Sequence, residues 1–174
     1  MFEVFRNAFK SPELRKKILF TLFIIIIFRI GSAIPAPFLD ASVLVNLFSG
    51  GNAFDYLNML SGGSFSNATL FALSITPYIN SSIIIQLLTV AIPPLERMAK
   101  EGGEGRRKLG KITRYTTVGL ALLQAVGYYF LIRNYGGIAY TSGMEGFFAG
   151  LVIVLVLTAG AALIMWLGEQ INDK

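Results

Sequence analysis

The chain has 174 residues, of which 54% are hydrophobic and 14% are charged, and its formal net charge is +5. A soluble domain typically carries about 25% charged residues, so this composition favours an integral membrane protein. The sequence contains neither Cys nor His, which excludes disulfides, thiolate or imidazole metal ligands and serine–histidine catalysis within this chain.

The basic residues are distributed unevenly around the apolar runs. Thirteen lie before the first run, between the second and third runs or at the C-terminus, whereas the two alternate segments contain only Arg133. Because Lys and Arg are enriched in cytoplasmic loops, we predict that both termini and residues 95–114 are cytoplasmic. Residues 38–51 and 136–146 are then predicted to lie outside. Binding of RNA or anionic lipid by the basic segments is a weaker addition to this interpretation.

Residues 1–17 are predicted to form a cytoplasmic amphipathic segment. Phe2, Phe5 and Phe9 recur at helical spacing, with Arg6 on the opposite side. This pattern is typical of a short helix that lies on the inner membrane surface.

The first membrane span is predicted at about 18–34. It follows Pro12, which favours the first turn of a helix, and it consists almost entirely of Ile, Leu and Phe. Arg29 is the charged exception near the outer end, and we interpret it as an anchor that reaches the interface by snorkelling, although a functional charge is the alternative. The Pro-Ala-Pro sequence that follows ends the helix. Residues 38–53 are predicted to be an outer loop.

Residues 54–94 are the most unusual stretch of the chain. The apolar run 54–60 is too short to cross a bilayer, which needs about 20 residues, and the break Ser61-Gly62-Gly63-Ser64 follows it. A second span is predicted at about 68–92. Its central polar residues and proline are Thr76, Pro77, Asn80, Ser81, Ser82 and Gln86. A polar run at membrane depth costs energy unless protein or water faces it, so we predict a re-entrant half-helix at about 54–66 and a polar-lined helix beside a pathway.

Residues 95–114 are predicted to be a solvated, flexible, basic loop. Their glycines lack the GK[ST] pattern of a phosphate-binding loop, and no strand precedes them.

The third span is predicted at about 115–132 and the fourth at about 147–167. Both contain small residues, including Gly150 and Gly160, which favour close helix packing. We interpret three tyrosines as residues of the outer membrane interface. They are Tyr128, Tyr129 and Tyr135.

Three long runs resemble the SecY family, the channel subunits of the protein translocon. They read SGGSFSNATLFALSITPYINSSIIIQLLT, KEGGEGRRKLGKITRY and MWLGEQINDK, and they occur in the family's order and separations. The resemblance implies an all-α membrane protein with four transmembrane helices and a short re-entrant plug half-helix, the N-terminal half of the SecY fold. Since the family has about ten spans in two pseudosymmetric halves, residues 18–174 would be its N-terminal membrane domain, ending after the fourth span.

The resemblance also assigns roles within the central stretch. The half-helix would be the plug that closes the pore from outside, and the helix after it would line the lateral gate, with the third span as its neighbour. Ile75 and Ile79 would belong to the hydrophobic pore ring. Their i, i+4 spacing independently places them on one helix face, although two Ile residues facing lipid would give the same pattern. The plug residues would be Phe54, Leu57, Leu60, Ser61, Gly62, Gly63 and Ser64, and the gate residues would be Asn80, Ser82, Ile83 and Gln86.

The implied function is passage of unfolded secretory proteins across the plasma (inner) membrane and release of signal and transmembrane segments through the lateral gate. The implied partners are the SecE and SecG subunits, the SecA motor ATPase, the ribosome, signal peptides, unfolded preproteins and membrane lipid. Arg106, Arg107 and Lys108 would belong to the cytoplasmic loop that meets the motor or the ribosome.

Two other function classes are alternatives to this interpretation. A small secondary transporter or ion channel would bind substrate at its broken helix, but it predicts acids or paired charges inside the membrane, and the predicted spans contain only Arg29. An intramembrane enzyme would need a nucleophile with a base, and no Lys or Asp lies inside a predicted span. We therefore predict that the chain is not an enzyme and uses no metal and no cofactor.

Overall fold

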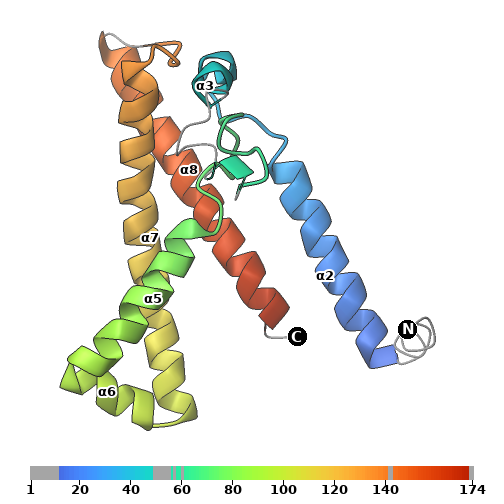
Figure 1. The fold of residues 1–174 in the computed structure, drawn as a ribbon, viewed down its shortest axis with the longest axis vertical. Coiled ribbons are helices and arrows are strands. Elements are labelled where there is room, and N and C mark those ends of the chain that lie inside the picture. The colour runs from blue at the N-terminus through green and yellow to red at the C-terminus, as the bar shows by residue number, and fades with distance from the viewer. Residues whose placement is uncertain (1–11, 49–55, 57, 60, 141–142, 173–174) are drawn as a thin grey trace.

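In the computed structural model of the chain, the described elements are six helices (Figure 1). The structure describes residues 12–48, 56, 58–59, 61–140 and 143–172. The helices are α2 (Pro12–Gly31), α3 (Ala41–Phe48), α5 (Thr76–Ala91), α6 (Pro93–Lys100), α7 (Gly103–Asn134) and α8 (Gly143–Asn172). The prediction of an all-α protein is confirmed.

Among the described residues, α7 and α8 are long and apolar enough to cross a membrane, and the pair α5–α6, bent by 102°, makes a third span if it is counted as one. This is fewer than the four predicted spans. The missing one is α2, which carries Glu13, three basic residues at 15–17 and Arg29. Its uncharged stretch 18–28 is roughly 16 Å long, against a hydrocarbon core of about 30 Å. A span through α2 stays a prediction.

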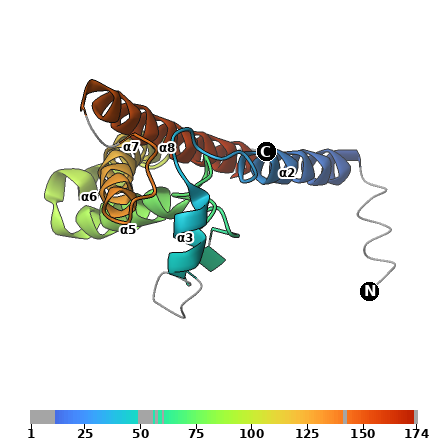
Figure 2. The same cartoon turned by 90° about the horizontal axis from the view of Figure 1, so that it is seen from above.

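The helices are arranged around the pair α7–α8. α8 lies between α7 and α2, while α5 crosses α7 and α6 returns to it (Figures 1 and 2). The start of α2, the helix α6 and the end of α8 lie at one end of the molecule, and α3 and the α7–α8 connection lie at the other (Figure 1). The basic residues at the start of α2 and those in α6 therefore lie at one end of the molecule, which is what the predicted topology requires.

The core lies between α7, α8 and the irregular segment 61–75. One face of α7 is buried at every third or fourth position, which is the helical period. These residues are Ala121, Ala125, Tyr128 and Ile132, and they pack with Ile153, Leu157 and Ala161 of α8 and with Ala68, Ala72 and Leu73. Small side chains on both helices let the backbones approach closely.

The second predicted span is wrong in its first third. The helix begins at Thr76 and not near residue 68, and residues 61–75 form consecutive turns with positive φ at Ala68 and Ser74 (47° and 52°). Pro77 explains the start, because a proline is accommodated in the first helical turn, where its missing N–H has no helical partner. The preceding backbone instead makes hydrogen bonds across to residues 34–36.

The predicted loop at 95–114 is also wrong in its local structure. α6 begins at Pro93, directly after α5 ends, and only residues 101 and 102 separate α6 from α7. Gly102 turns the chain with φ 77°, and a Cβ at Gly105 would collide with the carbonyl group of Met98. The basic residues of this region therefore stand on a rigid helical corner and not on a flexible loop.

The outer segment 38–53 contains a helix that was not predicted. Ser42 donates two hydrogen bonds to Asp40 Oδ1, from its backbone N–H at 2.9 Å and its hydroxyl at 2.6 Å. An Asp before a helix is a common start signal, and these bonds hold the pKa of the Asp40 carboxyl below its ordinary value.

The other predicted spans agree better with the structure. Residues 115–132 and 147–167 lie within α7 and α8. α2 begins at Pro12 as predicted, includes residues 12–17 of the predicted amphipathic segment, and ends at Gly31 before the predicted boundary at 34. Residues 1–11 lie outside the described part of the chain.

Candidate functional site

Ile75 and Ile79 lie one helical turn apart at the start of α5. The N–H of Ile79 donates to the carbonyl of Ile75 at 3.1 Å, and Ile75 is the residue directly before the helix. That the two side chains share a face stays a prediction. Ile75 is half-buried beside a cavity of about 330 Å³ that is also lined by Ile24, Phe28, Ile164 and Leu167. Ile79 is 48% exposed. Ile75 thus borders an open space between α2 and α8, and Ile79 is exposed one turn further along α5.

The face of α5 that begins with these residues continues as an uncovered stripe. Asn80, Ile83 and Gln86 are exposed and Ser82 is half-buried, and the Gln86 amide lies 3.3 Å from the Ser82 hydroxyl as its donor. On the other side of α5, which packs on α7, the buried residues are Pro77, Ser81 and Ile85. α5 therefore has one face in the protein interior and one mixed polar and apolar face that the described residues leave open.

The break at 61–64 is a hydrogen-bonded turn. Gly62 and Gly63 have positive φ (62° and 85°), a conformation that side chains disfavour. Ser61 is buried and its hydroxyl donates to the carbonyl of Asn58 at 3.0 Å while accepting the N–H of Phe65 at 3.0 Å. Ser64 is buried as well. Phe54, Leu57 and Leu60 of the predicted plug lie outside the described residues, and Tyr56, Asn58 and Met59 are helical.

Residues 68–71 anchor this segment to α2 and α8. The N–H of Ala36 donates to the carbonyl of Ala68 at 2.8 Å, the N–H of Leu70 donates to Ile34 at 3.0 Å, and the ring of Phe71 stacks on Phe28 with centroids 5.6 Å apart. Two glycines make room for it. A Cβ at Gly31 would collide with the Phe71 ring, and a Cβ at Gly160 would collide with the carbonyl oxygen of Leu70.

Tyr128 is not at the membrane interface, so that interpretation was wrong. It is buried in the core with 5% of its surface exposed, and its hydroxyl donates to the carbonyl of Phe65 at 2.6 Å. The two rings are in contact, with centroids 4.9 Å apart. Tyr135 is 56% exposed, which suits an interface, and Tyr129 is half-buried beside Gly150. Tyr128 follows Ala121 and Ala125 at helical spacing, and this spacing is the sequence feature that could have predicted its burial.

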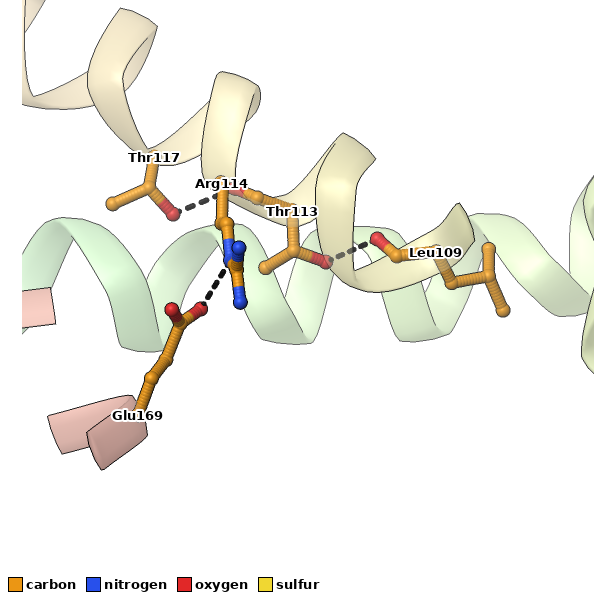
Figure 3. Close-up of polar contacts among 5 residues, drawn as sticks. All are labelled: Leu109, Thr113, Arg114, Thr117 and Glu169. Atoms are coloured by element: carbon orange, nitrogen blue, oxygen red, sulfur yellow. Dashed lines mark hydrogen bonds and ion pairs between the residues drawn. The ribbon is translucent and has the colours of Figure 1, made fainter. Parts of the chain in front are cut away.

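An ion pair that sequence reasoning missed joins the first half of α7 to the last turn of α8. Arg114 Nε lies 2.7 Å from Glu169 Oε1, and Figure 3 shows the two side chains reaching toward each other. Beside Arg114, the hydroxyls of Thr113 and Thr117 donate to backbone carbonyls of their own helix, at 3.0 and 2.7 Å (Figure 3). These threonines satisfy their polar groups without a partner outside the helix.

The predicted partner residues stand on the first turns of α7. Arg106, Arg107 and Lys108 are exposed. Lys108 lies near two carboxylates, with its Nζ 3.7 Å from Glu101 and 3.8 Å from Glu104. The described residues include no cluster of three His, Cys, Asp or Glu side chains placed to hold a metal ion.

A model of the SecY family matches residues 69–174, which include the open face of α5 and the ion pair between α7 and α8. The chain belongs to the SecY family. Three relatives, each called protein translocase subunit SecY, align over the whole chain: those of Streptomyces griseus (44% identity), Halalkalibacterium halodurans (43%) and Mycobacterium bovis (40%). The aligned regions make up 42%, 40% and 42% of these SecY proteins, so the chain spans about two-fifths of their length. The family resemblance of the three sequence runs is confirmed.

Proposed function

We propose that this chain is the amino-terminal part of a SecY channel subunit in the plasma membrane. In this role it passes unfolded secretory proteins across the membrane and releases signal and transmembrane segments sideways into lipid. The observation that carries the proposal is the open face of α5, where branched apolar and polar side chains alternate on a helix whose other face is firmly packed. The chain covers about 42% of the length of its relative, and we assign the helices that pack against this face to the part of the channel subunit that the chain does not cover.

The chemistry of the face fits a passage for polypeptide. Ile75 and Ile79 form part of a hydrophobic ring, which offers a translocating chain no strong binding and seals against ions by dewetting when it is narrow. Asn80, Ser82 and Gln86 weaken the contact with the opposing gate helices, so the gate opens at modest cost. A signal segment that binds the open gate shifts the population toward it. No bond is made or broken by this chain, and no cofactor is needed.

The distribution of charge between the ends of the molecule supports the proposed topology and partners. α2, α5, α7 and α8 supply four spans, and the basic end, which includes α6 and both termini, faces the cytoplasm. The exposed residues Arg106, Arg107 and Lys108 contact the SecA motor or the ribosome on the cytoplasmic side. These partners supply the energy or the substrate chain, which this chain does not provide. The turn 61–64 belongs to the plug, and SecE and SecG are the companion subunits.

Cysteine cross-linking tests the proposal, because this chain contains no cysteine of its own. Ile79→Cys and Ile85→Cys are compared in a full-length channel without other cysteines, with a secretory protein arrested during export. Ile79 is 48% exposed on the open face, whereas Ile85 is 6% exposed on the packed face. We expect cross-links from position 79 to the arrested protein and none from position 85. Equal cross-linking at both positions, or none at position 79 in an active channel, would refute the channel function of this face.

A further inference from the structure

We propose that Tyr128 is a positioning residue that holds the channel closed by fixing the turn 61–66 on α7. The hydrogen bond from its hydroxyl to Phe65 exists in the closed state and has to break when the turn moves away. This inference rests on the proposed role of the turn as part of the plug.

The geometry makes Tyr128 a firm anchor for the turn. It stands in the last third of α7, a helix of 32 residues, and its neighbours on the same face are buried in the core. Its hydroxyl lies 2.6 Å from the carbonyl oxygen of Phe65, which is 63 positions away in the sequence. The Phe65 ring rests against the Tyr128 ring at a tilt of 57°. Tyr128 therefore links the turn to α7 by a hydrogen bond and a ring contact.

Thr69 donates two hydrogen bonds to the Ser64 carbonyl, at 3.1 and 3.2 Å. The remaining hydrogen bonds described for the turn give it its shape and not its position. Gly62 and Gly63 donate their N–H groups to the carbonyls of Met59 and Asn58 at 3.1 and 2.9 Å, and Ser66 donates its N–H to the side chain of Asn58 at 3.1 Å. The bridge to residues 34–36 begins only at Ala68. The turn is thus a preformed unit next to a fixed point, and Tyr128 sets where it rests.

Packing beneath the turn is incomplete. An open pocket of about 230 Å³ lies between the turn and α7, and its lining includes Ser61, Phe65, Gln124 and Tyr128. The hydroxyl of Ser64 is buried without a hydrogen-bond partner among the described residues. An unsatisfied buried hydroxyl disfavours the closed position. The Tyr128 hydrogen bond favours it, so its loss has a visible effect on the balance between closed and open states.

Tyr128→Phe is the decisive variant, because it removes the hydroxyl and keeps the ring. Phe65 still accepts the N–H of Ala68 at 3.3 Å, so no carbonyl is left without a donor. Tyr129→Phe is the matched control, since it removes a hydroxyl from the next residue, for which the structure gives no contact with the turn. A neutral hydrogen bond changes an equilibrium by roughly two- to tenfold.

Two measurements are made on the full-length channel in membranes. Hydrogen exchange of the amides of residues 64–69 reports release of the turn, and export of a reporter with a defective signal reports opening. We expect Tyr128→Phe to speed exchange by roughly two- to tenfold and to raise export of the defective reporter, with export through a normal signal unchanged. Tyr129→Phe should change neither.

Unchanged exchange in Tyr128→Phe would overturn the role of Tyr128. Faster exchange without any gain in export of the defective reporter would instead show that the turn is released but is not a plug, and the proposed function of residues 61–64 would then be wrong. If Tyr128→Phe does not assemble, cysteines at Ser61 and Gln124, which line the same pocket, are joined by a short bifunctional thiol reagent. Export that continues through the joined channel would also overturn the proposal.

Discussion

Arg114 and Glu169 are 55 positions apart in the sequence, yet their side chains meet at 2.7 Å and connect the first half of α7 with the last turn of α8 (Figure 3). The Glu169 side chain is 17% exposed and the Arg114 side chain is 53% exposed, so water screens the pair only on one side. Such a contact limits how far α7 and α8 can separate at this point. It also keeps the packed side chains of the two helices opposite one another.

Replacing this ion pair should weaken the α7–α8 contact moderately. We expect Arg114→Ala and Glu169→Gln each to lower the free energy of unfolding, with a coupling of about 0.5–1 kcal/mol in a double-mutant cycle, because the pair is partly solvated. Denaturant unfolding of the purified full-length channel measures it. The pair Lys108–Glu101, 3.7 Å apart with both side chains about half exposed, is the control and should show coupling near zero. Additive effects of Arg114→Ala and Glu169→Gln would contradict the expectation.

Gly160 is the second position where a small change should have a large effect. Its missing side chain leaves room for the carbonyl oxygen of Leu70, so Gly160→Ala forces the backbone of the irregular segment away from α8. We expect a loss of about 1–3 kcal/mol in the free energy of unfolding. Gly119→Ala is the matched control in α7, where an added Cβ meets no atom within 4 Å, and it should be neutral or stabilising by up to about 1 kcal/mol. Equal thermal stability of the two variants would contradict the close contact.

The sequence predicted those features that depend on local pattern. Long apolar runs identified α7 and α8. The start of α5 was missed because hydropathy continues through residues 68–75, and the helical signal of Pro77 was not used. Tyr128 was misassigned since an aromatic residue near a span end suits an interface as well as a core. The contact of Arg114 with Glu169 depends on how two distant helices pack, which no local pattern contains.

The topology predicts different accessibility of two exposed positions at opposite ends of the molecule. Ala139 lies in the segment between α7 and α8, and Lys100 lies at the end of α6. We expect a cysteine at position 139, and not one at position 100, to react with an impermeant thiol reagent in intact cells, because the basic end faces the cytoplasm. Labelling in opened cells shows that both thiols are reactive. Labelling at position 100 but not at position 139 in intact cells would reverse the orientation.

Substitutions at Gly62 provide a graded test of the turn, because the structure gives both its backbone conformation and the side chain nearest to it. Its φ of 62° disfavours side chains, and the atom nearest to an added Cβ is Arg29 Nη1 at 3.9 Å. A charged side chain at position 62 would thus have the Arg29 guanidinium as its nearest neighbour, and not the apolar ring residues Ile75 and Ile79. Valine should be worst, since a branched side chain tolerates this conformation least, and strain of about 1–3 kcal/mol is typical. Aspartate should be mildest, because it tolerates the conformation better than most residues and its carboxylate can pair with Arg29.

The expected order of resting ion leak and of export through a defective signal is therefore Gly62→Val, then Gly62→Ala, then Gly62→Asp, then the natural chain. Conductance of full-length channels in planar bilayers and export of the reporter in cells measure the two effects. Arg29→Gln is the control for the pairing, because in its presence Gly62→Asp should lose its advantage over Gly62→Ala. If Gly62→Asp leaks more than Gly62→Val while Arg29 is intact, the strain of the turn and its contact with Arg29 do not govern closure.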